Sequence, residues 1–220
     1  MPELVFLSEK NRERFLRIIS PLVSLLARLG VHPNIISISG LALSLAAGII
    51  YSTGSFFWAA WVLVAAGTCD VLDGMLARQT EKESLFGAFF DSTFDRYGET
   101  AVFLGLAWYF SGGTVLFSSR VVCQSPVTVL FIILAASGSF MVSYTRARAE
   151  GLGVECKVGW MQRPERVTLL IIGSLLGSIP GVGTILMSLT LFLLALLSNI
   201  TAIQRILHVR RQLADWVAAP

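Results

Sequence analysis

Four aspartates lie close together in the sequence, within two otherwise apolar segments: Asp70, Asp73, Asp91 and Asp95. The first two are three residues apart and the last two are four apart, so each pair projects from one face of a helix. Four carboxylates in a low dielectric repel one another strongly, and divalent cations with oxygen ligands neutralise them. The spacing therefore predicts a site for one or two divalent cations, and such a site attracts phosphate groups.

Three small residues accompany these acids: Gly74, Ala77 and Gly87. Without bulky side chains, they would let a ligand approach the helix backbone, although close packing of two helices also explains small residues. For the aspartates, the alternative is a set of structural ion pairs with Arg78 and Arg96. Four acids beside two arginines leave negative charge uncompensated, and this favours the metal site.

The composition places the acids in a membrane protein. Of 220 residues, 55% are hydrophobic and 14% are charged, and the mean hydropathy is +0.72. That leaves too little polar surface for a water-soluble globule and excludes disordered and collagen-like chains. The cysteines, Cys69, Cys123 and Cys156, lack the spacing of a zinc site or a disulfide framework. Membrane topology explains the net charge of +3 better than nucleic acid does, and no nucleic-acid partner is expected.

Six apolar segments predict an all-α integral membrane protein with six transmembrane helices, at residues 33–51, 56–78, 85–110, 126–150, 164–176 and 183–207. Before them, charged residues 10–17 run into spaced apolar residues, a pattern typical of an amphipathic helix on the membrane surface. We expect a single membrane domain over residues 1–220. It comprises a juxtamembrane helix at 1–30, a six-helix catalytic bundle at 31–210 and a cytoplasmic tail at 211–220.

The lysines and arginines predict the orientation of these spans in the membrane. Of the 17, all but Arg120 fall on one side of the six predicted spans. Because such residues are retained on the cytoplasmic side, both termini and the acidic site are expected at the cytoplasmic face of the cytoplasmic (inner) membrane.

The acids and small residues together resemble a family signature. From Asp70 to Asp95, eight positions in 26 residues follow the pattern DxxDGxxAR, eight residues, then GxxxDxxxD. This resembles the signature of the CDP-alcohol phosphatidyltransferases, integral membrane enzymes of phospholipid synthesis. The resemblance implies a displacement assisted by two Mg²⁺ ions, with Mn²⁺ as an alternative. In it, an alcohol acceptor replaces CMP on a CDP-linked lipid such as CDP-diacylglycerol or its archaeal equivalent. It also implies a homodimer surrounded by membrane lipids.

The resemblance also implies roles for individual residues. Asp70, Asp73 and Asp91 would bind the tighter metal ion, and Asp95 would complete the second site and act as the general base. The residues expected along the nucleotide are Asn34, Ser37, Asp70, Gly74, Ala77, Arg78 and Gly87. The first two belong to a Pro-Asn-x-x-Ser stretch that resembles the family's element near the cytidine, although a locally capped helix start explains it equally.

Two basic stretches bear on the acceptor: they carry Arg146 and Arg148, and Arg163 and Arg166. Arginine suits bidentate phosphate recognition, so a phosphorylated acceptor is expected, whereas anchoring of helix ends at anionic lipids is the alternative. Arg146 and Arg148 are two residues apart, so at most one should point into a pocket unless the helix end unwinds. Both stretches resemble the inositol phosphate branch of the family, with Gln162 in place of the usual Glu and Arg146 in place of a common Lys.

Inositol phosphate is therefore the expected acceptor, and glycerol 3-phosphate is the nearest alternative. Uncharged acceptors such as serine or free inositol explain the arginines less well. An alternative of a different class is a divalent-cation transporter, but the first, fourth, fifth and sixth predicted spans carry no acid in their interiors. A structural scaffold would not need four buried acids.

Overall fold

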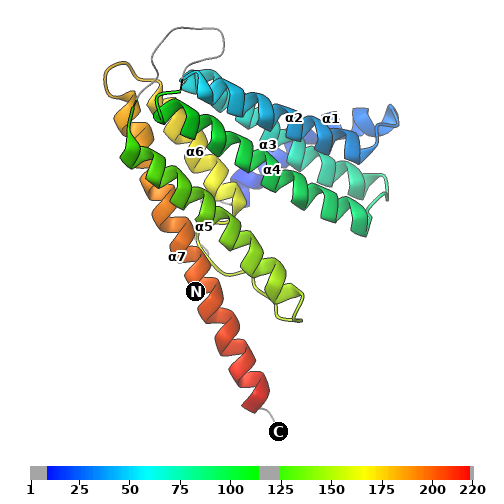
Figure 1. The fold of residues 1–220 in the computed structure, drawn as a ribbon. Helices are drawn as coiled ribbons and strands as arrows, with labels where there is room; N and C mark the ends of the chain where they lie inside the picture. Colours follow the sequence, from blue (N-terminus) through cyan, green and yellow to red (C-terminus); the bar gives the residue numbers. More distant parts are fainter. Residues whose placement is uncertain (1–8, 114–123, 219–220) are drawn as a thin grey trace. The chain divides into compact units, whose positions relative to one another are not determined.

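The computed structural model describes residues 9–113 and 124–218, which hold seven α-helices (Figure 1). They are α1 (Glu9–Arg28), α2 (Pro33–Ser52), α3 (Phe56–Gln79), α4 (Leu85–Phe110), α5 (Pro126–Glu150), α6 (Arg163–Gly177) and α7 (Gly183–Ala218). Arg120 and Cys123, which the sequence analysis named, lie outside the described residues.

The ends of the helices follow from local chemistry. Proline is the first residue of α2 and of α5, where its missing N–H costs nothing. The Ser84 hydroxyl accepts a hydrogen bond from the Gly87 N–H at 2.9 Å and so caps α4. At the other extreme, α7 continues 11 residues beyond the predicted end at Leu207, since no proline or glycine interrupts the sequence before Ala218.

Four helices in the described part of the chain are long and apolar enough to cross a membrane: α2, α3, α5 and residues 183–214 of α7. The protein is thus an integral membrane protein. The other two predicted spans, α4 and α6, are not among these four helices, for different reasons. Helix α4 has 26 residues but carries four charged ones, Asp91, Asp95, Arg96 and Glu99, and α6 has only 15 residues. At 1.5 Å per residue, α6 is about 22 Å long, less than the roughly 30 Å of a hydrocarbon core.

The helices form two compact units, one of α1–α4 and one of α5–α7. In the first, α2 packs against both α3 and α4, and α1 packs against α3 (Figure 1). Glycines bring α2 and α4 into backbone contact, because a Cβ added at Gly105 would lie 1.9 Å from the Gly48 carbonyl oxygen. Two turns earlier on α4, a Cβ added at Gly98 would lie 2.9 Å from the Ser44 Cβ. These contacts fix the register of α4, which carries two of the four aspartates.

Helix α1 buries one part of its apolar surface and exposes another. Ile19 and Val23 pack against Leu72 and Leu76 of α3. Four further apolar residues are exposed: Ile18, Leu22, Leu25 and Leu29. An exposed apolar stripe of this kind suits the surface of a membrane.

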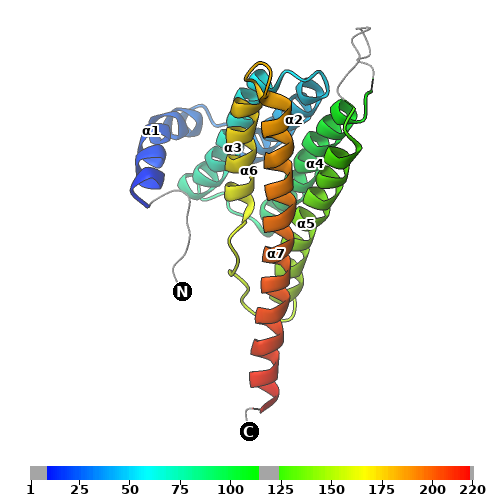
Figure 2. The same ribbon diagram turned by 90° about the vertical axis from the view of Figure 1, so that its left-hand side faces the viewer.

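In the second unit, α5 and α6 each lie along α7 (Figure 2). Small residues again allow the approach: a Cβ added at Gly138 of α5 would lie 2.9 Å from the Ser198 Cβ of α7. On α6, a Cβ added at Gly173 would lie 2.2 Å from Cγ2 of Thr190. The Asn199 side chain also donates a hydrogen bond to the Leu134 carbonyl, 3.0 Å away, and so ties α7 to α5.

Candidate metal and phosphate site

Three aspartates from two helices converge in the α1–α4 unit. One carboxylate oxygen each from Asp70 of α3 and from Asp91 and Asp95 of α4 lie within 4.8 Å of one another. All three residues are partly buried. The donor set consists of oxygen atoms alone, as Mg²⁺ and Mn²⁺ prefer, and contains no histidine or cysteine that would favour zinc.

Asp73, the fourth predicted ligand, lies beside this group and is not part of it. Its side chain is buried, and its Oδ2 accepts a hydrogen bond of 2.5 Å from the Ser37 hydroxyl of α2. The negative charges of Asp91 and Asp70 both act on it. Ser37, predicted from sequence as a nucleotide contact, therefore orients one of the acids across a helix interface.

The residues predicted to lie along the nucleotide come from all three helices around the acids. A Cβ added at Gly87 would lie 3.8 Å from Oδ1 of Asn34, which brings the start of α2 near the first turn of α4. At Gly74, the nearest atoms to such a Cβ are the two terminal nitrogens of Arg78, at 3.8 Å. Arg78 is exposed and Ala77 half-buried. The helix surface at Gly74 is therefore open apart from a guanidinium group, which suits a phosphate.

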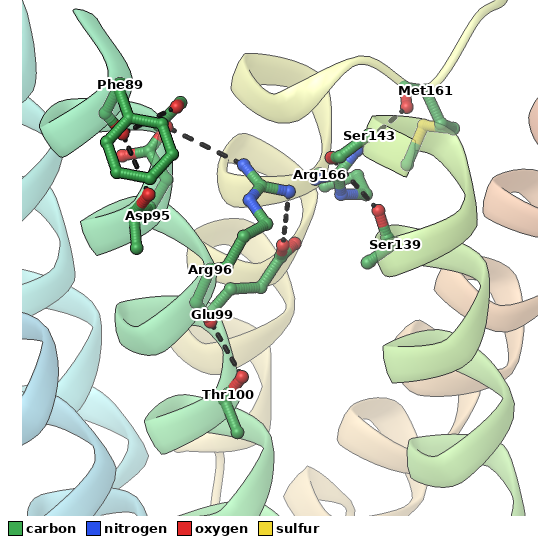
Figure 3. A network of polar contacts seen from close by, with 11 residues as sticks. Phe89, Asp95, Arg96, Glu99, Thr100, Ser139, Ser143, Met161 and Arg166 are labelled. Carbon is green, nitrogen blue, oxygen red and sulfur yellow. Dashed lines mark hydrogen bonds and ion pairs between the residues drawn. The ribbon is translucent and has the colours of Figure 1, made fainter. Parts of the chain in front are cut away.

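An ion-pair network continues along α4 from the acidic group (Figure 3). Arg96 contacts Asp95 with one terminal nitrogen, at 3.6 Å, and donates a hydrogen bond of 3.2 Å to Glu99 with the other. From the sequence, Arg96 was predicted only as an alternative partner for the aspartates, and Glu99 was not predicted. The signal that could have found Glu99 is its position three residues after Arg96, inside an apolar helix.

The predicted acceptor residues all lie in the α5–α7 unit, in different environments. Arg146 pairs with Glu150 one turn later, at 2.8 Å, and Arg148 is exposed. Arg163 begins α6 and is partly buried. Arg166 is only 2% exposed; it lies beside Ser139 and Ser143 (Figure 3) and donates a hydrogen bond to the Met161 carbonyl at 3.2 Å.

A further buried arginine belongs to this basic group. Arg205 of α7 is 2% exposed and donates hydrogen bonds to the backbone carbonyls of Val158, at 2.8 Å, and Val142, at 2.5 Å. The positive charges of Arg146 and Arg166 both act on it. From the sequence, Arg205 contributed only to the predicted orientation of the chain in the membrane. The missed signal was an ionisable residue inside a predicted span.

The chain is similar in sequence to a family of known proteins. A family profile described as CDP-alcohol phosphatidyltransferase matches residues 30–202. The phosphatidylinositol phosphate synthase of Streptomyces avermitilis is 35% identical over 97% of this chain and 86% of that protein. The archaetidylinositol phosphate synthase of Methanothermobacter thermautotrophicus is also 35% identical, over 90% of this chain and 91% of that protein.

Solved structures of the phosphatidylinositol phosphate synthase of Mycobacterium tuberculosis are also similar. The structure with CDP-DAG bound has a TM-score of 0.76 and 32% identity, and the match covers 88% of this chain and 94% of that chain. The structure in complex with manganese and citrate has a TM-score of 0.76 and 31% identity, over 86% and 87% of the two chains.

Proposed function

Since this chain belongs to the CDP-alcohol phosphatidyltransferase family, we propose that it transfers a phosphatidyl group from CDP-diacylglycerol, or an ether-lipid equivalent, to an inositol phosphate and releases CMP. The observation that carries the choice of acceptor is the group of arginines in the α5–α7 unit. Relatives named for phosphatidylinositol phosphate and archaetidylinositol phosphate support the same headgroup. Membership of an enzyme family argues against the transporter alternative.

The acids would hold two divalent cations, Mg²⁺ or Mn²⁺. Asp70, Asp91 and Asp95 offer converging oxygens, and Asp73, oriented by Ser37, completes the set. When bound, the cations neutralise the pyrophosphate oxygens of the donor and stabilise the departing CMP. The manganese in the mycobacterial structure supports this assignment for the present chain.

Asp95 would act as the general base. Its carboxylate accepts the proton of the acceptor hydroxyl while the hydroxyl oxygen forms a bond to the phosphorus that carries the lipid. The bond between that phosphorus and the bridging oxygen of the pyrophosphate breaks, and CMP leaves with the electron pair. The nucleotide would lie along Asn34, Gly74, Ala77, Arg78 and Gly87.

The phosphate of the acceptor would be bound by arginines. We assign this role to Arg146, Arg148, Arg163 and Arg166, and we add Arg205, because its charge interacts with those of Arg146 and Arg166. Guanidinium groups bind phosphate oxygens in pairs of charge-assisted hydrogen bonds. Two of these arginines, Arg166 and Arg205, are buried, and a phosphate would bring negative charge beside them, whereas an uncharged acceptor would not.

Release of CMP by the purified protein tests the proposal. With CDP-diacylglycerol and Mg²⁺ present, we expect release with inositol phosphate and none with glycerol 3-phosphate, serine or free inositol. Chelation of the metal with EDTA should abolish it. Release only with glycerol 3-phosphate would preserve the role of the aspartates and contradict the acceptor assignment.

Two arginine variants sharpen this test. Arg146→Met should raise the KM for inositol phosphate about tenfold, the effect of losing one charged hydrogen bond, and leave the KM for CDP-diacylglycerol unchanged. Arg148→Met removes the same charge at the same helix end, from an exposed position, and should have a smaller effect. Equal effects of the two substitutions would show that only the total charge matters.

We also propose that all six helices α2–α7 span the membrane as one catalytic domain, with both termini in the cytoplasm. The lysines and arginines support this orientation, because all but one of them fall on the predicted cytoplasmic side. Alkaline phosphatase fused after Thr53 should therefore be active outside the cytoplasm of a bacterial host, and phosphatase fused after Thr80 should be inactive. The reverse pattern of phosphatase activities would show the opposite topology. The homodimer stays a prediction.

A further inference from the structure

Asp95, the proposed base, contacts an ion pair on its own helix, formed by Arg96 and Glu99 (Figure 3). Arg96 has one terminal nitrogen 3.2 Å from Oε2 of Glu99 and the other 3.6 Å from Oδ2 of Asp95. The side chains are 22%, 15% and 13% exposed, respectively, so water has little access to them. The arginine therefore connects two acids across one turn of α4.

The backbone beneath this network is fixed. The Thr100 hydroxyl donates a hydrogen bond of 2.7 Å to the Arg96 carbonyl, and Gly98 packs tightly on Ser44 of α2. Rotation of α4 about its axis would break the packing at Gly98. The direction of the Asp95 carboxylate is consequently set by its side-chain partners and not by movement of the helix.

The geometry of arginine makes such a partner effective. A guanidinium group is planar and rigid, so a hydrogen bond at one terminal nitrogen fixes the direction of the other. An arginine paired with glutamate on an exposed helix contributes only about 0.2–0.5 kcal/mol, whereas ionisable groups within membrane segments are costly. The stability gained from this ion pair therefore does not explain the presence of Arg96 and Glu99 within a membrane segment.

We propose that Arg96 and Glu99 are positioning residues for the transfer reaction. Glu99 holds Arg96, and Arg96 holds the carboxylate of Asp95 in the orientation in which it accepts the proton of the acceptor hydroxyl. Neither residue touches the substrate; both act through Asp95. This inference rests on the proposed function, in which Asp95 is the base.

Steady-state kinetics of CMP release test this role. Glu99→Gln keeps the size of the side chain and removes its charge, and Arg96→Lys keeps the charge and removes the rigid fork. Each should lower kcat about 10- to 100-fold, as loss of a partner of a metal-site ligand does. The KM for CDP-diacylglycerol should change less than about twofold, since the substrate itself loses no contact.

A double variant separates positioning from a structural role. If Glu99 acts through Arg96, adding Glu99→Gln to Arg96→Met should cause no further loss of kcat. Ser92→Ala, on the same helix at an exposed position, is the matched control and should keep the kcat of the wild type. Losses that multiply in the double variant would contradict the proposal, and so would a full kcat in Glu99→Gln.

The same measurements distinguish a failure of this inference from a failure of the proposed function. A wild-type protein that releases no CMP with any of the four acceptors overturns the function and the inference with it. An active wild type with a fully active Glu99→Gln variant overturns the positioning role alone. The melting temperature of each variant in detergent shows whether a loss of kcat reflects unfolding.

Discussion

Replacement of Asp95 by asparagine is expected to abolish CMP release and leave the fold intact. The amide has the shape of the carboxylate but cannot take up the proton of the acceptor hydroxyl, and it removes one of three converging negative charges. Loss of a general base lowers the rate about 10²- to 10⁴-fold. The measurements are CMP release with saturating substrates and the melting temperature of the purified protein.

Glu83→Gln provides the matched control for this variant. Glu83 lies in the turn between α3 and α4 and is exposed, so the same change of carboxylate to amide should leave turnover unchanged. A near-normal turnover in Asp95→Asn would refute the assignment of the base. A melting temperature far below that of the wild type would show that Asp95 also holds the fold together.

Substitution of Gly105 by alanine is expected to disrupt the α1–α4 unit and eliminate activity. The new Cβ would lie 1.9 Å from the Gly48 carbonyl oxygen and 2.7 Å from its carbonyl carbon. Both are backbone atoms, so no side chain can move aside, and the helices must separate. Overpacking of this kind costs about 1–3 kcal/mol or more. We expect a lower melting temperature together with loss of CMP release, because α4 carries Asp91 and Asp95.

Gly67→Ala is the control for this second prediction. Gly67 also lies in a membrane helix, α3, but a Cβ added there would meet no atom within 4 Å. The substitution should preserve the melting temperature and activity, since alanine favours a helix over glycine by about 1 kcal/mol. Equal melting temperatures for the wild type and Gly105→Ala would contradict the backbone contact between α2 and α4.

The sequence predicted the helices and most of their limits, apart from the end of α7, because such limits depend on local residues. Proline opens α2 and α5, serine caps α4, and apolar runs of the right length lie between these signals. The convergence of Asp70 with Asp91 and Asp95 was predictable for the same reason. Helical spacing and the short turn between α3 and α4 bring their acidic faces together.

Contacts between distant segments could not be predicted in this way. Ser37 and Asp73 are 36 residues apart, and their hydrogen bond depends on the rotation of α2 relative to α3. Arg205 donates to backbone carbonyls, which have no sequence signature. A nearly uniform apolar segment does not reveal which face meets its neighbour, so the role of Gly48 and Gly105 also appeared only in the structure.

The division into two units has an evolutionary consequence. The acids and the glycines that hold α4 against α2 lie between Gly48 and Gly105, whereas the proposed acceptor arginines all lie between Arg146 and Arg205. After gene duplication, substitutions at the proposed acceptor arginines would alter headgroup choice without changing the residues of the metal site. Under the proposed function, a change of lipid headgroup would thus require substitutions in only one half of the gene.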